Sequence, residues 1–177
     1  MYQIYNVPST TPVLKIQFLL EDYLTHFENE IKKNVGEMDY KTNVKGQMTG
    51  FQHFLKDKKF NDFLKIFCDK LNYTKQINDC LKLKNFNSIQ VVDAWGNKLN
   101  SGEVVKPHHH IGSVDYSSVL YFSNTYLFVE KKKIKVSRGD VLTFFCTAEH
   151  WTEEANEERL SLAFNWRNTS KTSWDKK

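Results

Sequence analysis

The chain has the length and composition of one globular domain. It contains 177 residues, of which 40% are hydrophobic and 26% are charged, and its formal net charge is +4. This balance excludes disordered and fibrous proteins, and the length allows a substantial hydrophobic core.

The sequence shows no signal that would direct the chain to a membrane or out of the cell. No apolar run reaches the roughly 18–20 residues of a membrane span, and the first residues lack the pattern of a secretory signal. Cys68, Cys80 and Cys146 lack metal-site spacing, which is typical of reduced thiols. The three lysines at 131–133 fit a turn that opens an exposed strand, so we do not expect nucleic-acid binding. We expect a cytoplasmic protein, in the host cytosol if the chain is viral, with no membrane partner.

Residues 1 to about 85 are mainly helical in pattern. Residues 12–19 alternate as in a strand, and residues 20–31 place their apolar side chains on one helical face before Gly36. Residues 37–50 are polar and resemble a loop. Asp57 can cap a second helix that ends at Asn72 and whose apolar face is formed by Phe60, Phe63, Leu64, Phe67 and Leu71. Residues 77–81 indicate a short helix or turn.

From Ile89 onward the apolar period changes to that of strands. We expect strands at 89–95, 117–122, 126–129, 134–136, 141–145 and 159–166, with turns at 96–97, 100–102, 123–125 and 138–140. Short strands at regular spacing after a helical start predict an α+β, mainly β protein, a jelly roll supported by N-terminal helices. The whole chain, 1–177, is then one domain with its jelly-roll core at about 86–167.

Four of the six histidines lie in two short islands. His108 and His110 have the H-x-H spacing that points both imidazoles of a strand to one face, and His150 follows a later strand. The sequence therefore predicts a metal site formed by His108, His110 and His150, with His109 pointing away. The alternative is that these histidines are surface or hydrogen-bonded residues.

An arginine lies within the last strand pattern. Burial of the Arg159 guanidinium would be costly unless it were paired, and Ser161 faces the same side of the strand. Together they can hold a carboxylate, which predicts a dicarboxylate bound between the metal and this pair. The alternative is a salt bridge from Arg159 to Glu157 or Glu158. Trp95 and Asn97 share one face of an earlier strand and can line the same pocket, although Trp95 is equally compatible with the core.

These residues resemble a known group of proteins. The stretches 92–97, 106–110, 119–122, 139–145 and 157–165, together with His150, are similar to phage and bacterial 2-oxoglutarate–Fe(II) oxygenases of the prolyl-hydroxylase-like type. The resemblance implies a double-stranded β-helix that uses Fe(II), 2-oxoglutarate and O₂, oxidises a protein residue or a small molecule, and releases succinate and CO₂. It also implies that His150 is the distal iron ligand and that Arg159 and Ser161 bind the 5-carboxylate. Tyr121 on a neighbouring strand is a further candidate to hydrogen-bond 2-oxoglutarate; the alternative is a buried tyrosine whose hydroxyl has another partner.

The sequence departs from the superfamily at one ligand. Most members have H-x-D or H-x-E, whereas the third position here is His110, or Gly112 if the count starts at His110. Asp115 is the nearest downstream carboxylate and would need a loop to return to the metal. Two other functions remain open: a cupin-type metal dioxygenase that does not use 2-oxoglutarate, and a non-catalytic jelly-roll binding module.

Overall fold

The computed structural model is mainly β, with two α-helices among the described residues. It describes residues 2–6, 12–36, 42–72, 89–110, 112 and 114–169. The helices are α1 (Glu21–Asn34), the short 3-10 helix η1 (His53–Lys56) and α2 (Lys58–Asn72). The strands are β1 (Tyr2–Asn6), β2 (Pro12–Gln17), β3 (Val44–Lys45), β4 (Gln47–Met48), β5 (Ile89–Leu99), β6 (Val104–Val105), β7 (Tyr116–Tyr121), β8 (Thr125–Val129), β9 (Lys132–Val136), β10 (Asp140–Phe145), β11 (His150–Trp151) and β12 (Arg159–Asn168).

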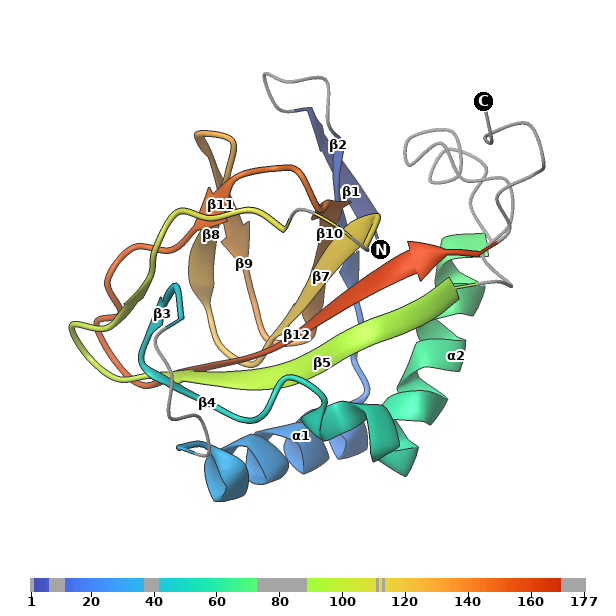
Figure 1. Cartoon of the computed structure of the whole chain (residues 1–177), viewed down its shortest axis with the longest axis horizontal. Helices are drawn as coiled ribbons and strands as arrows, with labels where there is room; N and C mark the ends of the chain where they lie inside the picture. The colour runs from blue at the N-terminus through green and yellow to red at the C-terminus, as the bar shows by residue number, and fades with distance from the viewer. Residues whose placement is uncertain are drawn as a thin grey trace.

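The strands form one large and two small sheets. The large sheet has the order β1-β2-β10-β7-β12-β5-β4, and a three-stranded sheet has the order β11-β8-β9. β3 and β6 form the third sheet. All of the pairings are antiparallel. The long strands β5 and β12 cross the front of the molecule in Figure 1.

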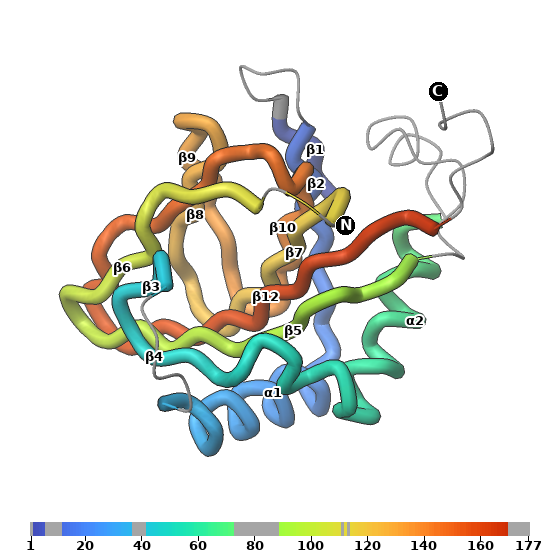
Figure 2. The backbone as a smooth tube through the Cα atoms, in the orientation of Figure 1, coloured from blue at the N-terminus to red at the C-terminus, as the bar shows by residue number. Residues whose placement is uncertain are grey.

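The large sheet is covered on both faces. On β12, Leu160, Leu162, Phe164 and Trp166 pack with the helices in one core cluster. On the opposite face, side chains of β2, β7 and β10 pack against the three-stranded sheet in a second cluster. α1 and α2 lie together on the outer side of the large sheet (Figures 1 and 2). The space between the two sheets is therefore the interior into which the alternate residues of β12 point.

The two helices begin and pack as their sequences predict. Leu24, Phe27 and Ile31 are the buried residues of α1, which Gly36 follows with a φ of +95°. In α2, the Asp57 carboxylate accepts a hydrogen bond of 2.7 Å from the Phe60 amide, which caps the helix. The expected helix or turn at 77–81 lies outside the described residues.

Three expectations were wrong or incomplete. Gly96 and Asn97 do not form a turn, because β5 continues to Leu99. A Cβ at residue 96 would lie 2.3 Å from Cγ1 of Ile31, so this glycine allows α1 to approach the strand. Within the expected loop at 37–50, β3 and β4 pair with β6 and β5. β1 was not predicted, although all of its residues pair with β2.

The other sequence features have simple places in the fold. The turn between β8 and β9 has positive φ at Glu130 and Lys131, and the Lys133 ammonium forms an ion pair of 2.8 Å with Glu153. Cys68 and Cys146 form no disulfide with a described residue, and Sγ of Cys146 donates to the carbonyl of Val114 at 2.9 Å. In the described part of the chain no helix has the length and apolar character needed to cross a bilayer.

Candidate metal centre and anion pocket

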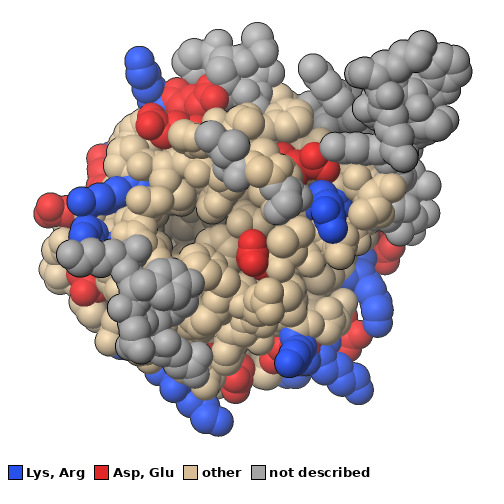
Figure 3. All heavy atoms as spheres, viewed as in Figure 1, with Lys and Arg blue, Asp and Glu red and all other residues tan. Residues whose placement is uncertain are grey.

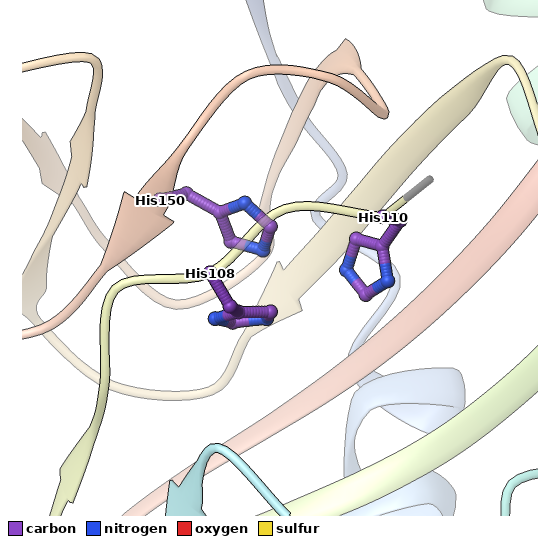
Figure 4. A group of neighbouring side chains, drawn as sticks. All are labelled: His108, His110 and His150. Atoms are coloured by element: carbon purple, nitrogen blue, oxygen red, sulfur yellow. The ribbon is translucent and has the colours of Figure 1, made fainter. Parts of the chain in front are cut away.

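Backbone hydrogen bonds bring the three predicted histidines together. His108 and His150 lie opposite each other in an isolated antiparallel bridge, with N–O distances of 3.1 and 2.9 Å. The His110 amide donates to the carbonyl of Cys146 at 2.8 Å. As a result, one potential ligand atom from each of the three imidazoles lies within 4.8 Å of the others. Figure 4 shows the three rings turned toward a common point.

Two of the three imidazoles are oriented by a second hydrogen bond. Nδ1 of His108 lies 2.8 Å from the carbonyl of Lys106, and Nδ1 of His150 lies 3.0 Å from that of Ala148. A carbonyl only accepts, so each Nδ1 carries the proton and each Nε2 keeps a free lone pair. This is the usual outer arrangement of a metal-binding histidine. Among the described residues none hydrogen-bonds the ring of His110.

The local environment keeps all three rings neutral. Burial lowers the pKa of His108 and lowers that of His150 well below its ordinary value. Burial, followed by the repulsion of the neighbouring histidines, lowers the pKa of His110 to about 4. Metal ions bind the neutral imidazole, so the cluster is ready to bind a cation at neutral pH.

The alternative ligands considered from sequence lie elsewhere. His109 is exposed, as expected. Gly112 is exposed and has no side chain to offer. One oxygen of the Asp115 carboxylate accepts a hydrogen bond of 2.9 Å from the Asn168 amide, and Asp115 is not part of the histidine group.

Arg159 is buried, and no carboxylate among the described residues pairs with it. Its side chain donates to the Thr125 hydroxyl at 2.8 Å and to the carbonyl of Glu153 at 3.5 Å. It is only 7% exposed, and burial lowers its pKa. In the described part of the chain Arg159 forms no ion pair, since Glu158 contacts Lys98 and Lys32 instead. The expected alternative of a salt bridge to Glu158 is therefore wrong.

Arg159 and the histidines line one cavity between the sheets. Alternation along β12 places Arg159 and Ser161 on the inner face, and Tyr121 lies opposite Ser161 on β7. Tyr121 is 2% exposed, and its hydroxyl has no hydrogen bond to a described residue. Burial raises its pKa, so the hydroxyl keeps its proton. On the face in Figure 3 the surface is hollowed, and mostly uncharged side chains surround the hollow.

Trp95 and Asn97 lie in the same cavity wall. The indole Nε1–H of Trp95 donates to Oδ1 of Asn97 at 3.0 Å, and Nδ2 of Asn97 donates to the Ser161 hydroxyl at 3.4 Å. Trp95 also forms an edge contact with Phe51, with ring centroids 5.2 Å apart. Both residues therefore line this cavity, and Trp95 belongs to an apolar cluster as well.

The sequence did not identify several other residues of the cavity. Thr152 lines the cavity and accepts a hydrogen bond of 3.0 Å from the Val105 amide. Thr125 lies outside this lining and accepts a hydrogen bond from Arg159. The Ser117 hydroxyl donates to Oδ1 of Asn165 at 2.7 Å in the same cavity. Their positions depend on the register between strands that are distant in sequence, and no motif signals that register.

Comparison with known proteins shows the fold but no close relative. No protein-family model and no curated protein matches the sequence. A viral collagen prolyl hydroxylase from Paramecium bursaria chlorella virus-1, solved with 2-oxoglutarate, superposes with a TM-score of 0.64 and 13% identity over 89% of this chain and 96% of its own. A prolyl-4-hydroxylase of Pseudomonas putida superposes with a TM-score of 0.62 and 18% identity over 92% of this chain and 95% of its own. HygX of Streptomyces hygroscopicus was solved with nickel, 2-oxoglutarate and hygromycin B. It superposes with a TM-score of 0.63 and 13% identity over 94% of this chain and 86% of its own.

These likenesses concern the course of the backbone. The chain matches the jelly-roll fold of 2-oxoglutarate–Fe(II) oxygenases along most of its length. The prediction of a mainly β protein of that fold with supporting N-terminal helices is confirmed. At 13–18% identity, these three likenesses show the fold alone.

Proposed function

We propose that this protein is an Fe(II)- and 2-oxoglutarate-dependent dioxygenase built on a double-stranded β-helix, and that it hydroxylates a small molecule or a protein side chain. One observation supports this most directly. The three neutral imidazoles share a cavity with Arg159, a buried cation that has no ion-pair partner among the described residues. A dianion that binds the metal at one end and the guanidinium at the other satisfies both groups.

The donor set fits a divalent first-row transition metal. Three nitrogen ligands of neutral charge suit Fe, Zn, Cu and Ni, and they leave the other coordination positions open. His108, His110 and His150 would hold the ion, and the carbonyls that bind Nδ1 of His108 and His150 would keep those rings in place. Iron bound there with 2-oxoglutarate would supply the oxidation by O₂.

The protein's own groups then orient the co-substrate. Arg159 donates to the 5-carboxylate with its remaining N–H groups, while Thr125 holds one end of the guanidinium. Ser161 and Tyr121 add hydroxyl donors from two neighbouring strands. The apolar cluster around Trp95 forms part of the cavity wall and limits the access of water there.

The two other functions fit the cavity less well. A cupin-type dioxygenase that does not use 2-oxoglutarate needs no buried, unpaired arginine beside its metal. A non-catalytic module does not require three imidazoles whose free lone pairs converge. It also does not require a guanidinium in the same cavity. Use of 2-oxoglutarate as co-substrate distinguishes the proposed oxygenase from the cupin-type dioxygenase and the non-catalytic module.

A turnover assay tests the proposal. The protein reconstituted with Fe(II) in the presence of O₂ and ascorbate should convert 2-oxoglutarate to succinate, slowly without substrate and faster with the correct one. His150→Ala should abolish succinate release, and His109→Ala, at an exposed histidine, should retain it. Succinate release that is equal in wild type and His150→Ala would contradict the proposed metal centre.

A further inference from the structure

A directed chain of hydrogen bonds runs along one wall of the cavity. It runs from Trp95 Nε1 to Asn97 Oδ1 at 3.0 Å and from Asn97 Nδ2 to Ser161 Oγ at 3.4 Å. Trp95 and Asn97 are each 6% exposed, so water does not compete freely for these groups. Asn97 and Ser161 face each other in the register of β5 and β12.

The direction of this chain follows from the chemistry of its first member. An indole N–H is a donor only, so the group of Asn97 that faces Trp95 has to be its carbonyl oxygen. The amide NH₂ then faces Ser161, and Oγ of Ser161 accepts from it. The Ser161 hydroxyl proton is consequently directed elsewhere, and no described residue accepts it.

A ligand in the cavity can accept the hydrogen bond that the Ser161 hydroxyl donates. Arg159 precedes Ser161 by two residues on the same face of β12, and Tyr121 lies directly opposite Ser161 on β7. The guanidinium is a donor, and neither hydroxyl donates to a described residue. A carboxylate offers only acceptors and satisfies all of these groups, whereas the NH₂ of a carboxamide would meet other donors.

We propose that Trp95 and Asn97 are positioning residues that hold the Ser161 hydroxyl as a donor toward the distal carboxylate of the co-substrate, and that this chain contributes to the selection of a carboxylate over a carboxamide. The inference rests on the proposed use of 2-oxoglutarate. It assigns Trp95 and Asn97 a role in co-substrate selection, which is separate from any contact with the oxidised substrate.

The test compares 2-oxoglutarate with its 5-amide, 2-oxoglutaramate, by anaerobic calorimetry on the Mn(II)-loaded protein. Wild type should bind the dicarboxylate at least about 100-fold more tightly than the amide, because the amide leaves buried donors unpaired. Asn97→Asp supplies an acceptor to Ser161, so the hydroxyl turns its proton away from the cavity. Binding of 2-oxoglutarate should weaken by about 30-fold or more, and the preference over the amide should fall below about 10-fold.

A second variant keeps the test decisive if Asn97→Asp does not fold. Trp95→Phe removes the N–H that orients the amide and retains an aromatic wall. It should weaken 2-oxoglutarate binding by about 3- to 10-fold. In a Ser161→Ala background the same change should have no further effect, since its influence passes through the hydroxyl. Mn(II) affinity should stay unchanged in Trp95→Phe and in the same variant made in the Ser161→Ala background. A general structural defect would lower that affinity.

The outcomes separate this inference from the proposed function. No metal-dependent binding of 2-oxoglutarate by wild type would overturn both. Normal binding by wild type with an unchanged amide preference in the variants, or a Trp95→Phe effect that persists without the Ser161 hydroxyl, would overturn the positioning role alone.

Discussion

Replacing Arg159 with methionine should stabilise the ligand-free protein while abolishing its response to 2-oxoglutarate. The guanidinium is 7% exposed and has only neutral partners among the described residues. A group that is retained at a cost to stability is best explained by a ligand that pairs with it. Methionine fills a similar volume without a charge to bury.

The magnitude follows from the contacts of this side chain. Burying an ion without a counter-charge costs several kcal/mol. The 2.8 Å hydrogen bond to Thr125 returns about 1.5–3 kcal/mol, and the 3.5 Å contact with the Glu153 carbonyl adds little. The net gain on replacement should be about 1–3 kcal/mol, which raises Tm by roughly 2–12 °C for a domain of this size.

Thermal melts with and without ligand measure both effects. For wild type with Mn(II), 2-oxoglutarate at about 100 times its Kd should add about 2.7 kcal/mol, a rise of roughly 5–11 °C. Arg159→Met should show no such rise. Arg138→Met is the matched control, because Arg138 forms ion pairs of 2.6 and 2.7 Å with Glu21 and Glu28. It should not stabilise the protein and should retain the ligand effect. An Arg159→Met protein that melts earlier and still responds to 2-oxoglutarate would refute the reasoning.

Three further predictions concern the framework and the histidines. Gly96→Ala should destabilise the protein by about 1–3 kcal/mol in chemical denaturation, because the new Cβ would meet Ile31, and the loss should shrink in an Ile31→Ala background. Asp57→Ala should cost about 0.5–2 kcal/mol by removing the cap on the Phe60 amide, and Asp57→Asn should restore most of it; equal losses would argue against capping. Burial lowers the pKa values of the cluster, that of His110 to about 4, so the unfolded chain takes up these protons first. Urea unfolding of the metal-free protein should therefore show stability falling from pH 6.5 toward pH 4, and stability that rises over this range would contradict the neutral cluster.

The helices and most strands could be predicted because their apolar period is strong. The stripe of α2 and the alternation of β12 correspond directly to buried faces. The error at Gly96 arose because glycine serves two purposes. It favours turns, but here it lies inside a strand and provides room for Ile31. Composition alone cannot distinguish the two uses.

The candidate site was partly predictable because some of its side chains lie on one face of a single segment. The H-x-H spacing and the pair Arg159-x-Ser161 place side chains on one face of a single segment, which local alternation predicts. The carbonyls that orient His108 and His150 lie only two residues before them, although no motif marks them. The contact between Thr125 and Arg159, in contrast, joins segments that are distant in sequence. Such contacts depend on strand register, and the sequence carries no local sign of them.

The central claim, a metal and a dicarboxylate bound together in one cavity, is tested most directly by anaerobic calorimetry of 2-oxoglutarate binding. The titration is made with and without Fe(II) or Mn(II), on wild type and on Arg159→Ala. We expect micromolar binding that requires the metal and disappears in the variant. Binding that is indifferent to the metal, or that survives in Arg159→Ala, or that is absent from the metal-loaded wild type, would contradict it.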